Sequence, residues 1–287
     1  MTDDDAQDES GGALQGGIIK QTIDSVTALA KAVPIYEDAV QPLAKETGKA
    51  LGTVGKAVNV ALAPLAGIVW GYDKIKDFIE TRVAEKLEKV PEERITTPQP
   101  NVAGPAIEAL RFSGNDETLR EMFANLIATS LDKKTALEAH PSFVDILKNI
   151  SADEGRILKL FTHNQSFPVV NVKLNIPTGG FHVLHRNVTQ LGQLAKCEHA
   201  ELATNYIDNL CRLGILEIPS RRRLNGDGPY APLLNDPGIV QLKNQFKPSD
   251  KPGEKKPTIG FDYRMLEITT LGQQFVRACV VDKALRP

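Results

Sequence analysis

The stretch SADEGRILKLF, residues 151–161, divides this chain of 287 residues into two parts with different sequence patterns. Ser151 and Glu154 have the spacing of a capping box, in which each side chain bonds the other residue's backbone N–H at the start of a helix. Before this point apolar residues recur every three or four positions, and no alternating strand pattern occurs before residue 165. After it, strand patterns appear between helices. We therefore predict a mainly α protein, with a helical N-terminal domain followed by an α+β C-terminal domain.

The N-terminal domain is predicted to extend from residue 17 to 150. It follows an acidic, glycine-rich tail at residues 1–16, which we expect to be disordered. The clearest element is an amphipathic helix at residues 74–90, which carries its apolar side chains on one stripe and ends at Pro91. Further helices are predicted at residues 18–46, 105–112, 116–131 and 142–150. Their short connections favour a helical bundle.

An uncharged apolar run, AVNVALAPLAGIVWGY at residues 57–72, precedes the amphipathic helix. A helix needs about 20 apolar residues to span the hydrocarbon core of a membrane, so this run is shorter than a standard span. Two interpretations stay open. The run is either the central hairpin of the bundle, or a segment that enters a membrane on activation, with Trp70 and Tyr72 at the interface. The side chains that would contact lipid are Val58, Leu62, Leu65, Ile68, Val69 and Trp70.

The C-terminal domain, residues 151–287, is predicted to be winged-helix-like, because its helices and strands follow one another in the order of that fold. The stretch 219–259 is polar and rich in glycine and proline, which predicts a long loop. A second capping box, at Thr270 and Gln273, predicts the start of the last helix. The remaining strands are expected at 169–174, 215–218 and 263–269, and the remaining helices at 188–195 and 201–213.

Two stretches of the chain resemble a known bacterial family. They are residues 101–158 and the upstream ALAPLAGIVWGYDKIKDF at residues 61–78. The chain resembles the abortive-infection alpha family, a domain of unknown function linked to phage defence. That resemblance implies a role in antiviral defence and brings no catalytic residue with it. The matching elements are Pro105, Leu110-Arg111, Leu119-Arg120, Phe123 to Leu126, His140 to Phe143 and Ser151 to Glu154.

The composition of the chain indicates its cellular compartment and the kind of partner that it binds. Residues 1–150 hold 16 Lys and Arg against 23 Asp and Glu, a balance of −7, whereas residues 151–287 hold 18 against 13, a balance of +5. The asymmetry indicates an anionic partner for the C-terminal domain, although the face of a committed DNA-binding protein is more basic. Three cysteines are too few for a disulfide framework, and the N-terminus lacks the pattern of a signal peptide. We therefore expect a cytoplasmic protein.

No residue pattern predicts a reaction, a metal site or a cofactor. The strongest metal candidates have spacings that fit no standard zinc motif; they are His182, His185, Cys197, His199 and Cys211. His140 precedes Pro141 and Ser142, an arrangement that is typical of a helix start rather than of catalysis. The glycines of residues 48–55 lack the G-K-[ST] ending of a phosphate-binding loop. We therefore predict a protein that is not an enzyme.

Nucleic acid is the alternative partner. The helix predicted at residues 201–213 occupies the position of a recognition helix but presents few cationic side chains. Basic residues instead cluster just after it, and the candidate nucleic-acid contacts are Arg212, Arg221, Arg222 and Arg223. This pattern favours a winged-helix regulator that binds DNA or protein as the alternative function.

The function that these patterns favour is a non-enzymatic anti-phage abortive-infection protein. The C-terminal domain would bind a trigger, such as a phage component, and the apolar run would act on the membrane. We expect the protein to associate with the membrane on activation and to form a homo-oligomer.

Overall fold

The computed structural model describes residues 71–249, 251 and 254–286. The chain divides into two compact units. The first contains the described residues up to Asn149 together with residues 281–286, and the second contains Ile150–Val280. The acidic tail, the helix predicted at residues 18–46 and the candidate membrane residues from Val58 to Trp70 lie outside the described residues.

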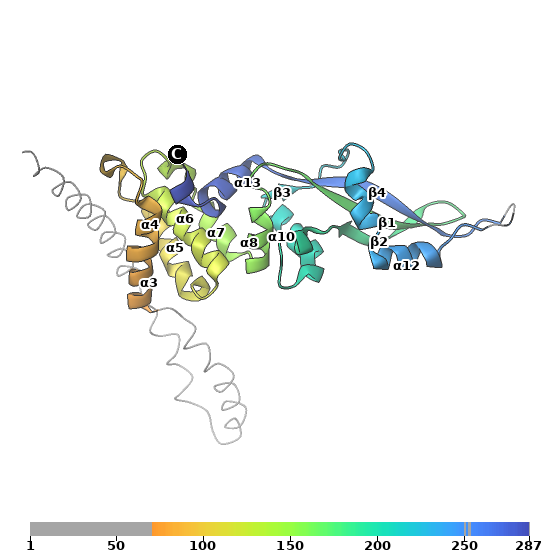
Figure 1. Ribbon diagram of the computed structural model, residues 1–287, viewed down its shortest axis with the longest axis horizontal. Coiled ribbons are helices and arrows are strands. Elements are labelled where there is room, and N and C mark those ends of the chain that lie inside the picture. The colour runs from red at the N-terminus through yellow and green to blue at the C-terminus, as the bar shows by residue number, and fades with distance from the viewer. Residues whose placement is uncertain (1–70, 250, 252–253, 287) are drawn as a thin grey trace, which may run out of the picture. The chain divides into compact units, whose positions relative to one another are not determined.

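Unit 1 is helical in its described part. The amphipathic stretch forms α3 (Tyr72–Phe78), a π-helical turn (Ile79–Val83) and α4 (Ala84–Leu87), and it buries its apolar stripe as predicted. The next helices, α5 (Pro100–Ser113), α6 (Glu117–Ser130) and α7 (Ser142–Lys148), pack side by side (Figure 1). Their buried side chains include Val102, Leu110, Phe123, Leu126, Ile127 and Phe143.

The start of α5 differs from the prediction. The helix begins at Pro100 rather than Pro105, because the first proline occupies the first turn, where its fixed φ and missing N–H cost nothing. Pro105 lies inside the helix and removes one backbone hydrogen bond from it. The start of α6 agrees with the prediction, since the Asp116 side chain accepts a hydrogen bond from the backbone N–H of Leu119 at 2.9 Å.

Short turns complete unit 1. Three 3-10 helices lie at Glu92–Arg94, Ala136–Glu138 and Lys283–Leu285. The third belongs to residues 281–286, which we call the C-terminal clasp. The clasp brings the charged side chains of Asp282, Lys283 and Arg286 against α4, α6 and the turn after α6.

Unit 2 is built on a four-stranded antiparallel sheet in the order β2-β1-β4-β3. The strands are β1 (Phe167–Asn175), β2 (Phe181–Val188), β3 (Leu216–Glu217) and β4 (Thr258–Ile268). β1 and β4 pair along their length, with Val170 opposite Tyr263. The described chain is therefore a mixed α and β protein.

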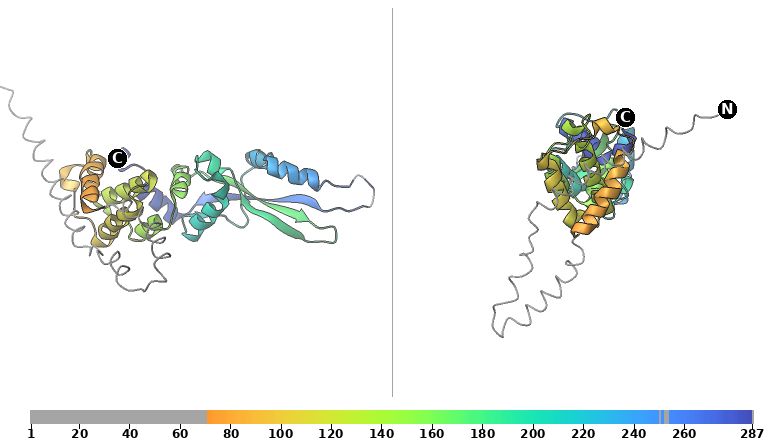
Figure 2. Two further views of the ribbon diagram at one scale, coloured as in Figure 1. Left: turned by 90° about the horizontal axis from the view of Figure 1, so that it is seen from below. Right: turned by 90° about the vertical axis from the view of Figure 1, so that its left-hand side faces the viewer.

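Helices flank this sheet at two places. α8 (Ala152–Lys159), α9 (Leu191–Leu194) and α10 (Ala203–Arg212) lie near β3, whereas α12 (Pro237–Gln245) runs alongside β4 (Figure 2). Between them lie a 3-10 turn (Gly228–Tyr230) and α11 (Ala231–Leu234). The chain ends the unit with α13 (Thr270–Phe275) and a π-helical turn (Val276–Val280).

Three predictions for unit 2 are corrected. The stretch 219–259 is not one long loop, because it contains α11 and α12 and the start of β4. The helix predicted at residues 188–195 is shorter, because Val188 still belongs to β2, for which no strand was predicted, and α9 begins only at Leu191. The cap of α13 is Thr269 rather than Thr270, since the Thr269 hydroxyl accepts the backbone N–H of Gly272 at 2.9 Å.

Candidate functional site

Asp153, in the first turn of α8, is the most heavily bonded carboxylate of unit 2. It accepts hydrogen bonds from the backbone N–H groups of Glu198 at 2.8 Å and His199 at 2.9 Å, and from the Tyr206 hydroxyl at 3.1 Å. It also pairs with Arg156. Burial alone would raise the pKa of Asp153, but the hydrogen bonds from His199, Glu198, Arg156 and Tyr206 outweigh burial and lower it to about 2. Asp153 is therefore an ionised structural anchor.

Glu154 joins α8 to α10. Its carboxylate accepts from the Ser151 backbone N–H at 2.6 Å and from the Asn209 amide at 2.6 Å, while the Ser151 side chain accepts from the Glu154 N–H. The predicted capping box is thus confirmed, and its glutamate also bonds a residue of α10. Both carboxylates hold the helices near β3 together.

The cysteine and histidine candidates do not form a reactive pair. Burial is the main reason that the pKa of the Cys197 thiol rises to about 11, and the charge of Asp153 adds to it. Burial likewise raises the pKa of Cys211 to about 11. A thiol with such a pKa stays protonated near neutral pH and is a poor nucleophile. Among the residues that the structure describes, no three histidine, cysteine or acidic side chains gather as metal ligands would.

His140 lies at the start of α7 in unit 1. Its Nδ1 atom accepts the backbone N–H of Ser142 at 3.2 Å and lies 2.7 Å from the Ser142 hydroxyl oxygen. The imidazole ring also lies 5.8 Å from the Phe143 ring, measured between centroids. These contacts make His140 part of the helix start, where Pro141 precedes the first helical residue.

Of the four candidate arginines, Arg212 ends α10 and the other three are consecutive in the loop after β3, and they differ in their contacts. Arg212 donates to Asn209 on its own helix at 2.6 Å, and Arg222 pairs with Glu267 of β4 at 2.6 Å. Arg223 pairs with Asp227 at 2.7 Å, and its guanidinium lies 4.9 Å from the Tyr263 ring centroid. Arg221 is exposed. Two of the four guanidinium groups are therefore already neutralised by carboxylates.

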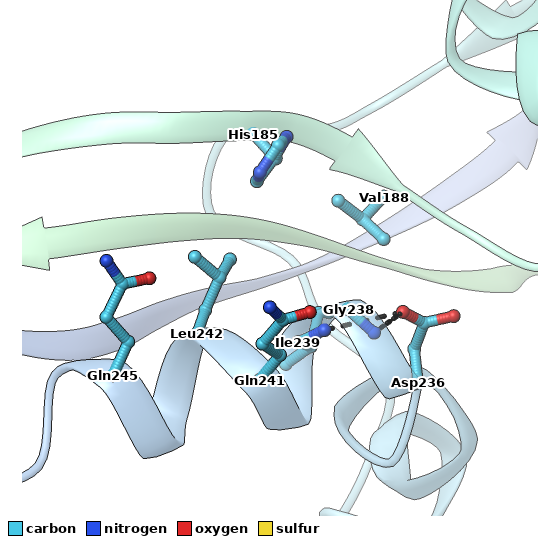
Figure 3. A pocket seen from close by; sticks show the side chains of 8 residues that line it. All are labelled: His185, Val188, Asp236, Gly238, Ile239, Gln241, Leu242 and Gln245. Atoms are coloured by element: carbon cyan, nitrogen blue, oxygen red, sulfur yellow. Dashed lines mark hydrogen bonds between the residues drawn. The ribbon is translucent and has the colours of Figure 1, made fainter.

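A groove between β2 and α12 combines apolar and polar groups (Figure 3). It has a volume of about 400 Å³ and is open to solvent. Gln241, Leu242 and Gln245 project from α12 toward the strands, and His185 lies on β2 across from them (Figure 3). Its lining residues are His185, Val188, Asp236, Gly238, Ile239, Gln241, Leu242 and Gln245.

A small apolar cluster positions α12 over the sheet. Val170 of β1 packs with Tyr230 and Leu233, and the Tyr230 hydroxyl accepts from the Leu224 N–H at 2.8 Å and donates to the Arg264 carbonyl at 2.9 Å. Lys243 of α12 donates to the Leu234 carbonyl at 2.8 Å. These bonds fix the connection into α12, and with it one wall of the groove.

The start of α12 supplies the acidic end of the groove. Asp236 caps the helix, because its Oδ1 atom accepts the N–H groups of Gly238 at 2.9 Å and Ile239 at 3.4 Å. The sequence signal for this helix was Asp236-Pro237, an N-cap followed by a proline in the first turn. That signal was missed because it lies within a stretch rich in glycine and proline.

The apolar run cannot be placed on this structure, since only Gly71 and Tyr72 of it are described. Within the part of the chain that is described, no helix has the length and apolar character to cross a membrane.

Comparison with known proteins identifies the family. No curated protein matches the chain. One solved structure that matches is an uncharacterized protein from the marine bacterium Alcanivorax borkumensis SK2; it is 14% identical, and the match covers 52% of this chain and 96% of that one with a TM-score of 0.33. The family model described as abortive infection alpha matches residues 71–279. The match spans both units and agrees with the resemblance seen in the sequence, and the chain belongs to the abortive infection alpha family.

Proposed function

We propose that this protein is a non-enzymatic effector of anti-phage abortive infection, and that its second unit binds a partner. The family supports the role in abortive infection. The observation that carries the binding proposal is a contrast within unit 2. Asp153, Glu154 and Cys197 are engaged in internal hydrogen bonds, whereas the polar groups of Gln241 and Gln245 border an open groove. Groups that recognise a partner need free donors and acceptors, so the groove suits binding.

In this proposal the apolar run at residues 57–72 damages the infected cell by entering its membrane. Its support comes from the sequence, which has no charged residue between Lys56 and Asp73 and places Trp70 and Tyr72 at its end. On this proposal the protein is cytoplasmic until a phage component triggers it. It then associates with the membrane and self-associates there.

A charge placed in the run tests this step. We would express wild type, Leu65→Lys and the control Leu137→Lys in a bacterial host, and follow phage plaques, growth and membrane potential together. Leu137 is 91% exposed in unit 1, so its variant adds the same charge outside the run. Wild type and Leu137→Lys should protect the culture and depolarise infected cells. Leu65→Lys should do neither, because a lysine near the centre of a membrane helix costs about 3 kcal/mol on insertion scales.

Folding must be established for all three proteins by circular dichroism. Protection by a folded Leu65→Lys protein, or protection without depolarisation, would contradict the membrane step. In that case the run belongs to the protein core.

A winged-helix regulator is the second candidate function. Its support is that α8, β1, α10, β3 and β4 occur in the order of a winged helix, with β2 and α9 inserted before α10 and α11 and α12 inserted before β4, and that β4 lies between β1 and β3. DNA binding through Arg212 and Arg221 to Arg223 would depend on phosphate contacts and weaken steeply as salt rises. A gel-shift titration with duplex DNA, using wild type and Arg221→Ala, distinguishes this candidate from the first.

A further inference from the structure

We propose that the groove between β2 and α12 binds a short extended peptide that carries alternate apolar side chains and one basic residue. This inference rests on the proposed partner-binding function and names the chemistry of the partner. Three features of the groove carry it: the spacing of two amides, the apolar floor and the position of one carboxylate.

The two amides match the repeat of an extended backbone. Gln241 and Gln245 are four residues apart on α12, which places them on one face and about 6 Å apart along the helix axis. An extended peptide presents equivalent peptide groups every second residue, about 6.6 Å apart. Each carboxamide offers both a donor and an acceptor, as a peptide group requires. In the described residues neither amide has an internal hydrogen-bond partner, so both are available.

The length and floor of the groove fit about four residues. From Asp236 to Gln245 the wall formed by α12 measures about 14 Å, and four extended residues measure about 13 Å. The floor includes Val188, Leu242 and Ile239, of which Ile239 is 4% exposed. Alternate side chains of an extended peptide point to one side, so every second residue would contact this apolar floor.

The charge of the groove indicates that the bound peptide carries a basic residue at one end. Asp236 is the single carboxylate among the described lining residues, and no lysine or arginine is among them. Its Oδ1 atom accepts both capping hydrogen bonds, which leaves the acceptor positions of Oδ2 for a partner. A lysine or arginine of the peptide could pair there. The same lining disfavours phosphate-bearing ligands, because it holds no lysine or arginine and because Asp236 already occupies N–H groups at the start of α12.

Titration of the full-length protein with defined peptides tests this inference. The probe is acetyl-Thr-Val-Thr-Val-Thr-Lys-amide, added to nitrogen-15-labelled protein and followed by chemical shift. We compare it with the same peptide ending in Glu, and with one methylated at two alternate backbone nitrogens. The first peptide should shift the amide signals of Asp236, Gln241 and Gln245. Both comparison peptides should bind about tenfold more weakly, because each lacks a charge pair or two hydrogen bonds.

Variants of the groove assign the contacts. Replacing Gln241 and Gln245 together by alanine should weaken binding about tenfold, while Asn244→Ala, exposed on the same helix outside the groove, should leave binding unchanged. Asp236→Asn keeps a good helix cap and removes only the charge. It should therefore abolish the preference for the peptide that ends in Lys over the one that ends in Glu.

The inference is overturned if no peptide shifts these signals at millimolar concentration, or if the methylated or acidic peptide binds equally well. A plaque assay with the same proteins separates this failure from that of the proposed function. If wild type protects cells but binds no peptide, only the peptide inference fails. If wild type gives no protection, the proposed function fails whatever the titration shows.

Discussion

At the residue scale, the stability of this protein depends on the charge of two buried carboxylates. Asp132 in unit 1 is fully buried and accepts from Arg94 at 2.5 Å and from Lys283 at 2.7 Å. Burial would raise its pKa, but the hydrogen bonds from Arg94 and Lys283 prevail and lower it to about 2. Asp153 plays the same part in unit 2. Each unit thus contains a buried carboxylate whose pKa several donors lower to about 2.

These two carboxylates predict a loss of stability in acid. Because each folded pKa lies below the unfolded value of 3.8, the stabilisation is complete above about pH 5 and disappears as the pH falls toward 2. Each group should contribute about 2 kcal/mol. Urea unfolding between pH 6 and 2.5 measures the effect. Asp145→Asn, an exposed carboxylate in a surface pair, should leave the slope unchanged. An unchanged unfolding free energy down to pH 3 would contradict the assignment.

At the element scale, local signals in the sequence predicted helices well and the groove poorly. The capping box of α8 and the stripe of residues 74–90 are local patterns, and both are present in the structure. β2 was missed because most of its residues are exposed, so its sequence lacks the alternation that marks a half-buried strand. The groove itself joins residues about fifty positions apart, such as His185 and Gln241. A spacing rule applies within one segment, so it cannot predict that residues of two distant segments line the same groove.

The contact between α13 and Ile215, the residue before β3, gives a prediction at this scale. Gly272, in α13, lies so close to the Ile215 carbonyl that a side-chain carbon there would overlap it. Gly272→Ala should therefore lower the free energy of unfolding by about 2 kcal/mol, although alanine favours helices. Gly238→Ala in α12, where the nearest atom is a side-chain oxygen of Asp236 at 3.2 Å, is the milder control. Calorimetry of both variants compares them, and equal melting temperatures would refute the close contact.

At the scale of the whole molecule, unit 2 is inserted into unit 1. The chain leaves unit 1 after Asn149 and returns to it at Val281. The clasp then completes a buried set of charges, since Lys283 reaches Asp132 and Thr135, and Asp282 reaches Lys86. Residues from both ends of the described chain therefore share one core.

Ending the chain at Val280 should destabilise unit 1 selectively. The truncation removes Lys283 from Asp132, and breaking a buried ion pair costs about 3 kcal/mol or more. Hydrogen exchange should become faster in α6 of unit 1 and stay unchanged in β1 of unit 2. Leu285→Ala serves as a control, because Leu285 is 78% exposed. Equal exchange in α6 of the truncated and intact chains would show that the clasp is dispensable.

The position of the clasp has a consequence for protein synthesis. A ribosome that has made Asn149 must still make the 131 residues from Ile150 to Val280 before the clasp can emerge. At the usual rate of translation that takes about 7 to 26 s. Until then Asp132 lacks Lys283, so unit 1 reaches its final stability only after Lys283 has been made and has left the ribosome. A chain that stops before the clasp therefore lacks a finished first unit, even though every helix of that unit up to α7 has already been made.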